Sequence, residues 1–224
     1  MVMSADGKTV IDGTEQGIGS ATDQRLMREL RVNADVILTG AGTLRATGAS
    51  SRLGDVGLEQ MRLDLGKPRF PVAAVLSHSG DLPLDRAFFT ARDFDAVVYA
   101  APGMPEERYE AIAATGRPVF RLPSEGPEAV VSMLAHMRHE LGARVLLVEG
   151  GPTVNAQFFA LDVVDEYFLT LGPVIVGGKD TLTAVEGDRA FARDNVKRLD
   201  LVAAVPNPAT GEVYLRYRVR HASR

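Results

Sequence analysis

The chain contains no cysteine and no tryptophan among its 224 residues. Without cysteine there are no disulfides, thiolate metal sites or thiol nucleophiles, which fits a reducing compartment. Aromatic residues are only 6% of the chain, too few for the stacking platforms that bind single-stranded nucleic acid. No apolar run approaches the roughly 20 residues of a membrane-spanning helix, and no signal peptide precedes the first predicted strand. We therefore expect a cytoplasmic protein with no membrane partner.

An excess of positive charge is also absent. The net charge is −4 and no basic run occurs, which argues against a nucleic-acid partner. The G-x-S-x-G, Walker and H-E-x-x-H motifs are missing. His136 and His139 are three residues apart on a predicted helix and could in principle share a metal ion. Their charged neighbours, with no carboxylate at ligand spacing, favour a solvated face, so no metal is expected.

The most informative stretch present is residues 144–159. Residues 145–148 form an apolar, β-branched run, typical of a strand buried on both faces. Gly150, Gly151 and Pro152 follow, and apolar residues then recur at helical spacing, which predicts a strand, a sharp turn and a helix. Such a turn directs backbone N–H groups at whatever lies above the sheet edge, and a phosphate can approach glycine closely. The alternative is a tight connection without a ligand.

The same pattern occurs earlier in the chain. Residues 35–39 are a second strand of the buried type, followed by Gly40-Ala41-Gly42-Thr43 and the start of a helix. Two such turns can hold a ligand with two phosphates, or one long ligand from both ends. Arg45 stands where the dinucleotide fingerprint G-x-G-x-x-G needs its third glycine, so that fold is not predicted.

The remaining patterns predict one domain over residues 1–224, with a mostly parallel mixed sheet and an antiparallel C-terminal hairpin. Ser20, followed by Asp23, resembles a capping box with a shorter acid and marks a helix start. The further strands are expected at 70–76, 96–100, 118–122 and 166–176, the last interrupted by Gly172-Pro173. The helices are expected at 20–33, 105–115 and 127–141, and the hairpin at 198–205 and 213–219. Residues 46–67 are predicted to be a long loop with one helical turn near 59–63. Residues 1–8 look like the end of a strand, so we expect the natural protein to begin a few residues earlier.

Several segments occur in an order that carries a resemblance: MSADGK at 3–8, LR at 30–31, ADVILTGAGT at 34–43, VEGGPT at 148–153, VVDE at 163–166 and GP at 172–173. Together they resemble the reductase (C-terminal) domain of bacterial riboflavin-biosynthesis deaminase–reductases, a domain similar to dihydrofolate reductase. The likeness covers nearly the whole chain. No deaminase zinc motif precedes it, so a stand-alone reductase is expected.

The resemblance implies a dihydrofolate-reductase-like three-layer α/β sandwich, with NADPH across the carboxyl ends of the parallel strands and a homodimer as the usual assembly. It implies hydride transfer to the ribose C1′ of an aminopyrimidine ribosylamine 5′-phosphate, a small-molecule substrate. Met3 and Gly17 would border the nicotinamide end. The other implied cofactor contacts are Thr43, Arg45, Thr47, Ser77, Gly150, Gly151, Pro152, Thr153, Val154 and Asn155.

The resemblance also implies roles at the reacting end. Glu149, Asp6 and Lys8 are the candidate catalytic residues, and Arg31 would face the substrate together with Glu149. Asp6 has turn formation as its alternative role, and Glu149 has hydrogen bonding to a neighbouring loop. Ser77, His78, Ser79 and Arg45 are candidate contacts for the cofactor 2′-phosphate, so NADPH is expected to bind more tightly than NADH.

One segment departs from the family pattern. After the Gly-x-Gly-Thr turn the family carries an Asp-x-Pro-x-Leu-type segment with a following arginine, whereas here Thr47 replaces the acid. Arg52 is then the one candidate left for the substrate phosphate. The identity of the substrate is therefore open, and two alternatives stand beside the pyrimidine reductase: a folate- or pterin-type reductase on the same scaffold, and a non-catalytic NADPH-binding protein.

Overall fold

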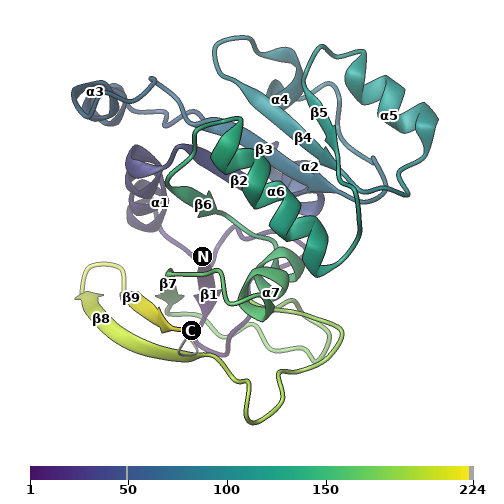
Figure 1. The fold of residues 1–224 in the computed structure, drawn as a ribbon. Coiled ribbons are helices and arrows are strands. Elements are labelled where there is room, and N and C mark those ends of the chain that lie inside the picture. The colour runs from purple at the N-terminus through teal and green to yellow at the C-terminus, as the bar shows by residue number, and fades with distance from the viewer. Residues whose placement is uncertain (49, 222–224) are drawn as a thin grey trace. The chain divides into compact units, whose positions relative to one another are not determined.

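A computed structural model describes residues 1–48 and 50–221 and divides the chain into two compact units (Figure 1). The central unit is Leu26–Gly150, and the terminal unit combines Met1–Arg25 with the chain from Gly151 onward. Parallel strands need long crossover connections, whereas a tight turn suffices for an antiparallel pair. The parallel strands joined through helices accordingly lie in the central unit, and the hairpin lies in the terminal unit. The prediction that the chain forms a single domain stays a prediction.

The central unit contains a five-stranded parallel sheet in the order β5-β4-β3-β2-β6. Its strands are β2 (Val36–Gly40), β3 (Val72–Ser77), β4 (Ala96–Ala100), β5 (Val119–Arg121) and β6 (Leu146–Val148). Its helices are α2 (Ala41–Thr47), α3 (Val56–Asp64), α4 (Ala87–Thr90), α5 (Glu106–Ala113) and α6 (Pro127–His139), together with the C-terminal part of α1 (Ala21–Asn33). Every residue of β2 and β4 is buried, as their continuous apolar runs predict.

β6 differs from its prediction as a strand buried on both faces. Its three residues are half-buried, and Val145 just before it is 44% exposed. β6 is the last strand in the order of its sheet and pairs with β2. A strand at a sheet edge has a neighbour on one side, so its side chains keep more contact with solvent.

The predicted loop 46–67 contains a helix of nine residues, α3, and not a single turn. The side chain of Asp55 accepts a hydrogen bond from Leu58 N at 3.0 Å and thereby caps its N-terminus. This cap was the sequence signal that the loop prediction missed. The four-residue helix α4 was also not predicted; its Phe88 and Phe89 are buried in the core of the central unit.

The terminal unit contains a four-stranded mixed sheet in the order β1-β7-β9-β8. Its elements are β1 (Val2–Ser4), α7 (Pro152–Ala160), β7 (Glu166–Gly172), β8 (Arg198–Asn207) and β9 (Glu212–Arg220). β1 runs parallel to β7, and β8 and β9 form the predicted antiparallel hairpin. β7 ends at Gly172, at the predicted interruption, and does not resume up to residue 176; Pro173 has no N–H for the ladder. A Cβ at Gly172 would lie 2.3 Å from Ile18 O, so only glycine fits there.

Candidate active site

The carboxyl ends of β2 and β6 lie side by side in the central unit. Glu149 N donates to Leu38 O at 2.9 Å, and Gly40 N donates to Gly150 O at 2.7 Å. The first strand–glycine turn, at Gly40, and the start of the second, at Gly150, therefore meet at one edge of the parallel sheet. Open α/β sheets place their ligands at this edge.

The turn after β6 uses its two glycines differently. Gly150 has φ +99°, a conformation that favours glycine. Gly151 has φ −76° and ψ −176°, an extended conformation that any residue can adopt, and it is the N-cap of α7. No side chain caps this helix, and Pro152 occupies its first turn. The first-turn N–H groups of α7 are thus available to an anion in the terminal unit.

Glu149 and Arg31 form a two-point ion pair in the central unit. Arg31 Nε donates to Oε1 and Nη2 to Oε2, both at 2.7 Å, and the two side chains are 18% and 8% exposed. Arg31 Nη1 donates to Ser50 O at 3.2 Å and Arg52 O at 2.8 Å. Both residues were expected to face a substrate. In the structure the Arg31 guanidinium faces the Glu149 carboxylate. Since a carboxylate has about four acceptor positions, two remain on Glu149 for another group.

Arg52, the candidate ligand for a substrate phosphate, is paired with Asp93. Its Nε and Nη2 donate to the two carboxylate oxygens at 2.8 Å, and its guanidinium lies 5.5 Å from the centre of the Phe94 ring. These hydrogen bonds raise the pKa of Arg52 and lower that of Asp93. A phosphate could bind the Nε–Nη2 edge of Arg52 only by displacing Asp93.

Arg45, a predicted contact for the cofactor 2′-phosphate, lies beside the turn after β3. Its Nη1 donates to Asp81 O at 2.7 Å and lies 3.5 Å from the Asp81 carboxylate, to which Arg108 also approaches within 3.6 Å. His78 and Ser79 are exposed in this turn, whereas Ser77 is buried and accepts a hydrogen bond from Gly80 N at 3.1 Å.

The two threonines predicted to contact the cofactor both lie on α2. The Thr47 hydroxyl donates to Thr43 O at 3.0 Å, a contact internal to the helix. Thr43 is half-buried, while Thr47 is exposed.

In the terminal unit, the Asp6 carboxylate binds the main chain of the loop that follows β7. Its carboxylate accepts hydrogen bonds from Ser4 Oγ at 2.6 Å, Val176 N at 3.0 Å and Gly177 N at 2.7 Å. The bond from Ser4, followed by those from Val176 and Gly177, lowers the pKa of Asp6 to about 2. Lys8 Nζ donates to Thr181 O at 3.2 Å. These contacts favour turn formation for Asp6 over catalysis.

The remaining predicted cofactor contacts also lie in the terminal unit. Met3 pairs with Leu171 in the β1–β7 ladder, and Gly17 has φ +88°. Val154 and Asn155 are each 8% exposed, and Asn155 Nδ2 donates to Ala184 O at 2.8 Å. Their side chains thus serve the fold. Asn155 N donates to Gly151 O at 3.0 Å, so of these two residues only Val154 keeps a main-chain N–H for a phosphate. Pro152 is half-buried and Thr153 exposed at the start of α7.

The capping box at Ser20 differs from the prediction. Ser20 Oγ accepts from Thr22 N and Asp23 N at 3.1 and 3.4 Å, but Ser20 N donates to Glu212 Oε1 at 2.6 Å. The distant Glu212 thus takes the place of the box acid. Asp23 has a short side chain and is buried beside Thr170 instead. Burial and the charge of Glu212 raise the pKa of Asp23, against the hydrogen bond from Thr170.

His136 is packed, not solvated as predicted. Its Nδ1 lies 2.9 Å from Tyr99 Oη, and its ring lies 4.3 Å from that of Phe120. Across residues 1–48 and 50–221, no cluster of three or more His, Cys, Asp or Glu side chains is arranged to hold a metal ion. Nor does any helix in that part of the chain have the length and apolar character needed to cross a membrane.

The sequence profile of the family described as the RibD C-terminal domain matches residues 1–205. A curated relative from Archaeoglobus fulgidus, named 2,5-diamino-6-ribosylamino-4(3H)-pyrimidinone 5′-phosphate reductase, is 28% identical over 89% of this chain and 90% of its own length.

Two solved structures are similar in fold. A pyrimidine reductase-like protein from Corynebacterium diphtheriae superimposes with a TM-score of 0.86 at 24% identity, over 99% of this chain and 90% of that one. Dihydrofolate reductase from Enterococcus faecalis, complexed with NADP(H), gives a TM-score of 0.50 at 15% identity, over 98% and 93% of the two chains. The predicted dihydrofolate-reductase-like α/β fold is thereby confirmed.

Proposed function

Because this chain belongs to the RibD C-terminal domain family, we propose that it is a riboflavin-pathway oxidoreductase. Its reaction is reduction of a pyrimidine ribosylamine 5′-phosphate, in which C1′ of the ribose gains a hydride and the sugar becomes a ribityl chain. NADPH supplies that hydride when bound. The chain's own residues bind and orient the reactants and stabilise charge.

The observation that carries this proposal is the Arg31–Glu149 pair at the carboxyl edge of the parallel sheet. Arg31 fixes the plane of the carboxylate through two hydrogen bonds. Two acceptor positions then remain in a defined direction for N–H or O–H groups of a substrate. A preorganised carboxylate can bind the polar edge of a pyrimidine or hold a proton near the nitrogen that gains one.

The residues present fit a nicotinamide dinucleotide in two separate respects. In the terminal unit, α7 begins at Gly151 without a side-chain cap, so its first-turn N–H groups suit a pyrophosphate. In the central unit, Arg45 binds Asp81 close to the exposed turn residues His78 and Ser79; the guanidinium and the hydroxyl group suit a 2′-phosphate that displaces the Asp81 carboxylate.

We accordingly expect NADPH to bind more tightly than NADH. Arg45→Gln should reduce the preference by about 1.5–3 kcal/mol, the contribution of a hydrogen bond to a charged group. Calorimetry with both cofactors measures the difference. Equal affinities in the wild type would contradict a 2′-phosphate site at this turn.

The proposed reaction is tested by following NADPH oxidation at 340 nm, with the diaminopyrimidine ribosylamine phosphate and its deaminated counterpart as substrates. Turnover with either supports the proposal. Binding of NADPH without turnover of any substrate would instead identify a non-catalytic cofactor-binding protein.

One observation favours a second candidate, a folate- or pterin-type reductase. Arg52, the expected ligand of a substrate phosphate, is engaged by Asp93. A substrate without a phosphate would leave that pair intact. Dihydrofolate therefore belongs in the same assay. Turnover with dihydrofolate alone would identify a folate- or pterin-type reductase and contradict the pyrimidine reductase.

A homodimer in the cytoplasm is part of the proposal. β8 is the last strand in its sheet order and bears exposed apolar side chains on Leu199, Leu201, Val202 and Val205. An edge strand of this character suits pairing with a second copy.

A further inference from the structure

The side chain of Arg62, on α3, is a fully buried cation in the central unit. Its relative exposure is 0%, and it donates to four main-chain carbonyls. Nε binds Pro68 O at 2.9 Å, and Nη1 lies 2.8, 3.0 and 2.6 Å from the carbonyl oxygens of Arg31, Val32 and Ala34. Burying a guanidinium is costly unless its N–H groups are satisfied, and here carbonyl oxygens accept hydrogen bonds from Nε and Nη1.

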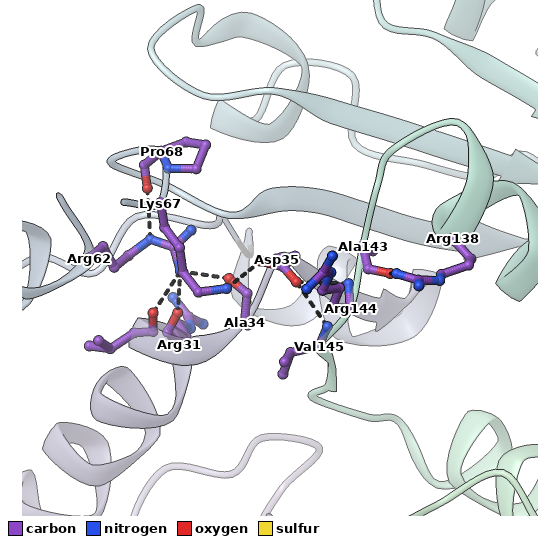
Figure 2. A network of polar contacts seen from close by, with 11 residues as sticks. Arg31, Ala34, Asp35, Arg62, Lys67, Pro68, Arg138, Ala143, Arg144 and Val145 are labelled. Atoms are coloured by element: carbon purple, nitrogen blue, oxygen red, sulfur yellow. Dashed lines mark hydrogen bonds and ion pairs between the residues drawn. The ribbon is translucent and has the colours of Figure 1, made fainter. Parts of the chain in front are cut away.

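Three of these carbonyls lie at the C-terminus of α1 and just beyond it. The last carbonyls of a helix have no partner within the helix and carry the negative end of its dipole. Arg62 therefore caps α1 from another helix and fixes where α1 ends (Figure 2). Arg31, whose side chain holds Glu149, is one of the residues whose main chain Arg62 binds.

A second set of contacts extends the restraint to β6. Asp35, directly after the capped carbonyls, accepts hydrogen bonds from Arg144 N at 2.8 Å and Val145 N at 2.9 Å and pairs with Lys67 (Figure 2). Val145 leads into β6, which ends beside Glu149. Both members of the Arg31–Glu149 pair thus stand on main chain tied to the segment from Arg62 to Pro68.

We propose that Arg62 is a positioning residue that holds the main chain of Arg31 and, through Arg31, sets the orientation of the Glu149 carboxylate. It contacts no reacting atom. The expected effect on turnover rests on the proposed reductase function, whereas the effect on the ion pair does not.

The chain offers a matched control in Arg117. Arg117 is 7% exposed and donates to the carbonyl oxygens of Phe88, Phe94 and Ala91, so it too is a buried guanidinium bound to main chain. It precedes β5, at the opposite end of the strand order from β6. Arg62→Met and Arg117→Met remove similar groups, but only the former loosens Arg31.

The first measurement is independent of activity. The ¹H–¹⁵N signal of Arg31 Nε, assigned by its loss in Arg31→Gln, reports the hydrogen bond to Glu149. It should broaden and exchange faster with water in Arg62→Met and stay unchanged in Arg117→Met. An unchanged signal in Arg62→Met overturns the proposal.

The second measurement is a double-mutant cycle on kcat/KM. Arg62→Met should lower kcat/KM by about 10- to 100-fold in the wild-type background, the cost of misplacing a catalytic group by up to about 1 Å. In an Arg31→Gln background it should add little, because residues acting through one another are not additive. An equal factor in both backgrounds overturns the proposal.

Arg62→Lys keeps the charge but reaches fewer carbonyls, so intermediate effects are expected; it replaces Arg62→Met if that variant does not fold. If the wild type reduces neither pyrimidine nor dihydrofolate, the proposed function fails, and the Arg31 Nε signal alone decides the positioning role.

Discussion

At the scale of single residues, Glu149 takes its orientation from Arg31. Both carboxylate oxygens accept hydrogen bonds at 2.7 Å, and both side chains are mostly buried. Removing one member of such a pair leaves the other with an unsatisfied charge. A change at Glu149 should therefore affect stability as well as chemistry.

Glu149→Gln keeps the size of the side chain and removes its charge. Turnover should drop by about 10²-fold, the scale of general acid–base catalysis. The free energy of unfolding should fall by about 1–3 kcal/mol, because a glutamine side chain offers Nε and Nη2 of Arg31 one acceptor oxygen in place of two. NADPH affinity should be nearly unchanged. Steady-state kinetics, denaturant melts and a cofactor titration measure the three effects, and undiminished turnover would assign Glu149 to loop support alone.

The buried carboxyl group of Asp23 should make the stability of the protein depend on pH. Burial raises its pKa, and the charge of Glu212 adds to the effect. Its folded-state pKa thus lies above the unfolded value of 3.8, so stability from the protonated form is present below pH 3.8 and is lost as the pH rises through the folded-state pKa. Asp23→Asn, which still accepts a hydrogen bond from Thr170, should raise the melting temperature at pH 7 and bring no gain near pH 3.5. Equal gains at both values would contradict the buried charge as the cause.

At the scale of elements, the β6–α7 turn separates two roles of adjacent glycines. Gly150 is needed for its φ of +99°, whereas Gly151 has a φ open to any residue. A side chain at Gly151 is therefore compatible with the backbone, and it would stand where a phosphate approaches the first turn of α7.

Gly151→Val should consequently leave the fold intact and weaken NADPH binding. Each charge-assisted N–H contact contributes about 1.5–3 kcal/mol, so loss of one lowers the affinity at least about tenfold. The matched control is Gly150→Val, which should destabilise the protein because valine disfavours positive φ. Calorimetry and thermal melts distinguish them, and normal NADPH binding by folded Gly151→Val would return this turn to a purely structural role.

At the scale of the whole molecule, β8 predicts self-association. Leu201 and Val205 are 58% and 54% exposed on the edge strand of the terminal sheet. Leu201→Lys with Val205→Lys places charges on that strand, as natural edge strands do to prevent pairing. By light scattering, the wild type should have the mass of a dimer and the variant that of a monomer. The melting temperatures of the two proteins, determined at equal concentration, are the control for folding of the variant. A monomeric wild type would contradict the proposed assembly.

Local patterns in the sequence determined most elements of the fold and the sheet edge at which the two glycine turns meet. The apolar run before Gly40, the run before Gly150 and the alternation around the hairpin each depend on neighbouring residues, and the corresponding strands were found. Parallel strands also share one carboxyl edge, so two glycine turns could be expected to meet there, as Gly40 and Gly150 do.

Only the tertiary structure decided which side chains pair. Arg31 and Glu149 are 118 residues apart, Ser20 and Glu212 are 192 apart, and Arg52 and Asp93 are 41 apart. A guanidinium or carboxylate accepts many partners of opposite charge, and its choice depends on which main-chain positions the fold brings within hydrogen-bonding distance. Arg62 is the clearest case, since its partners are backbone carbonyls that no residue pattern identifies.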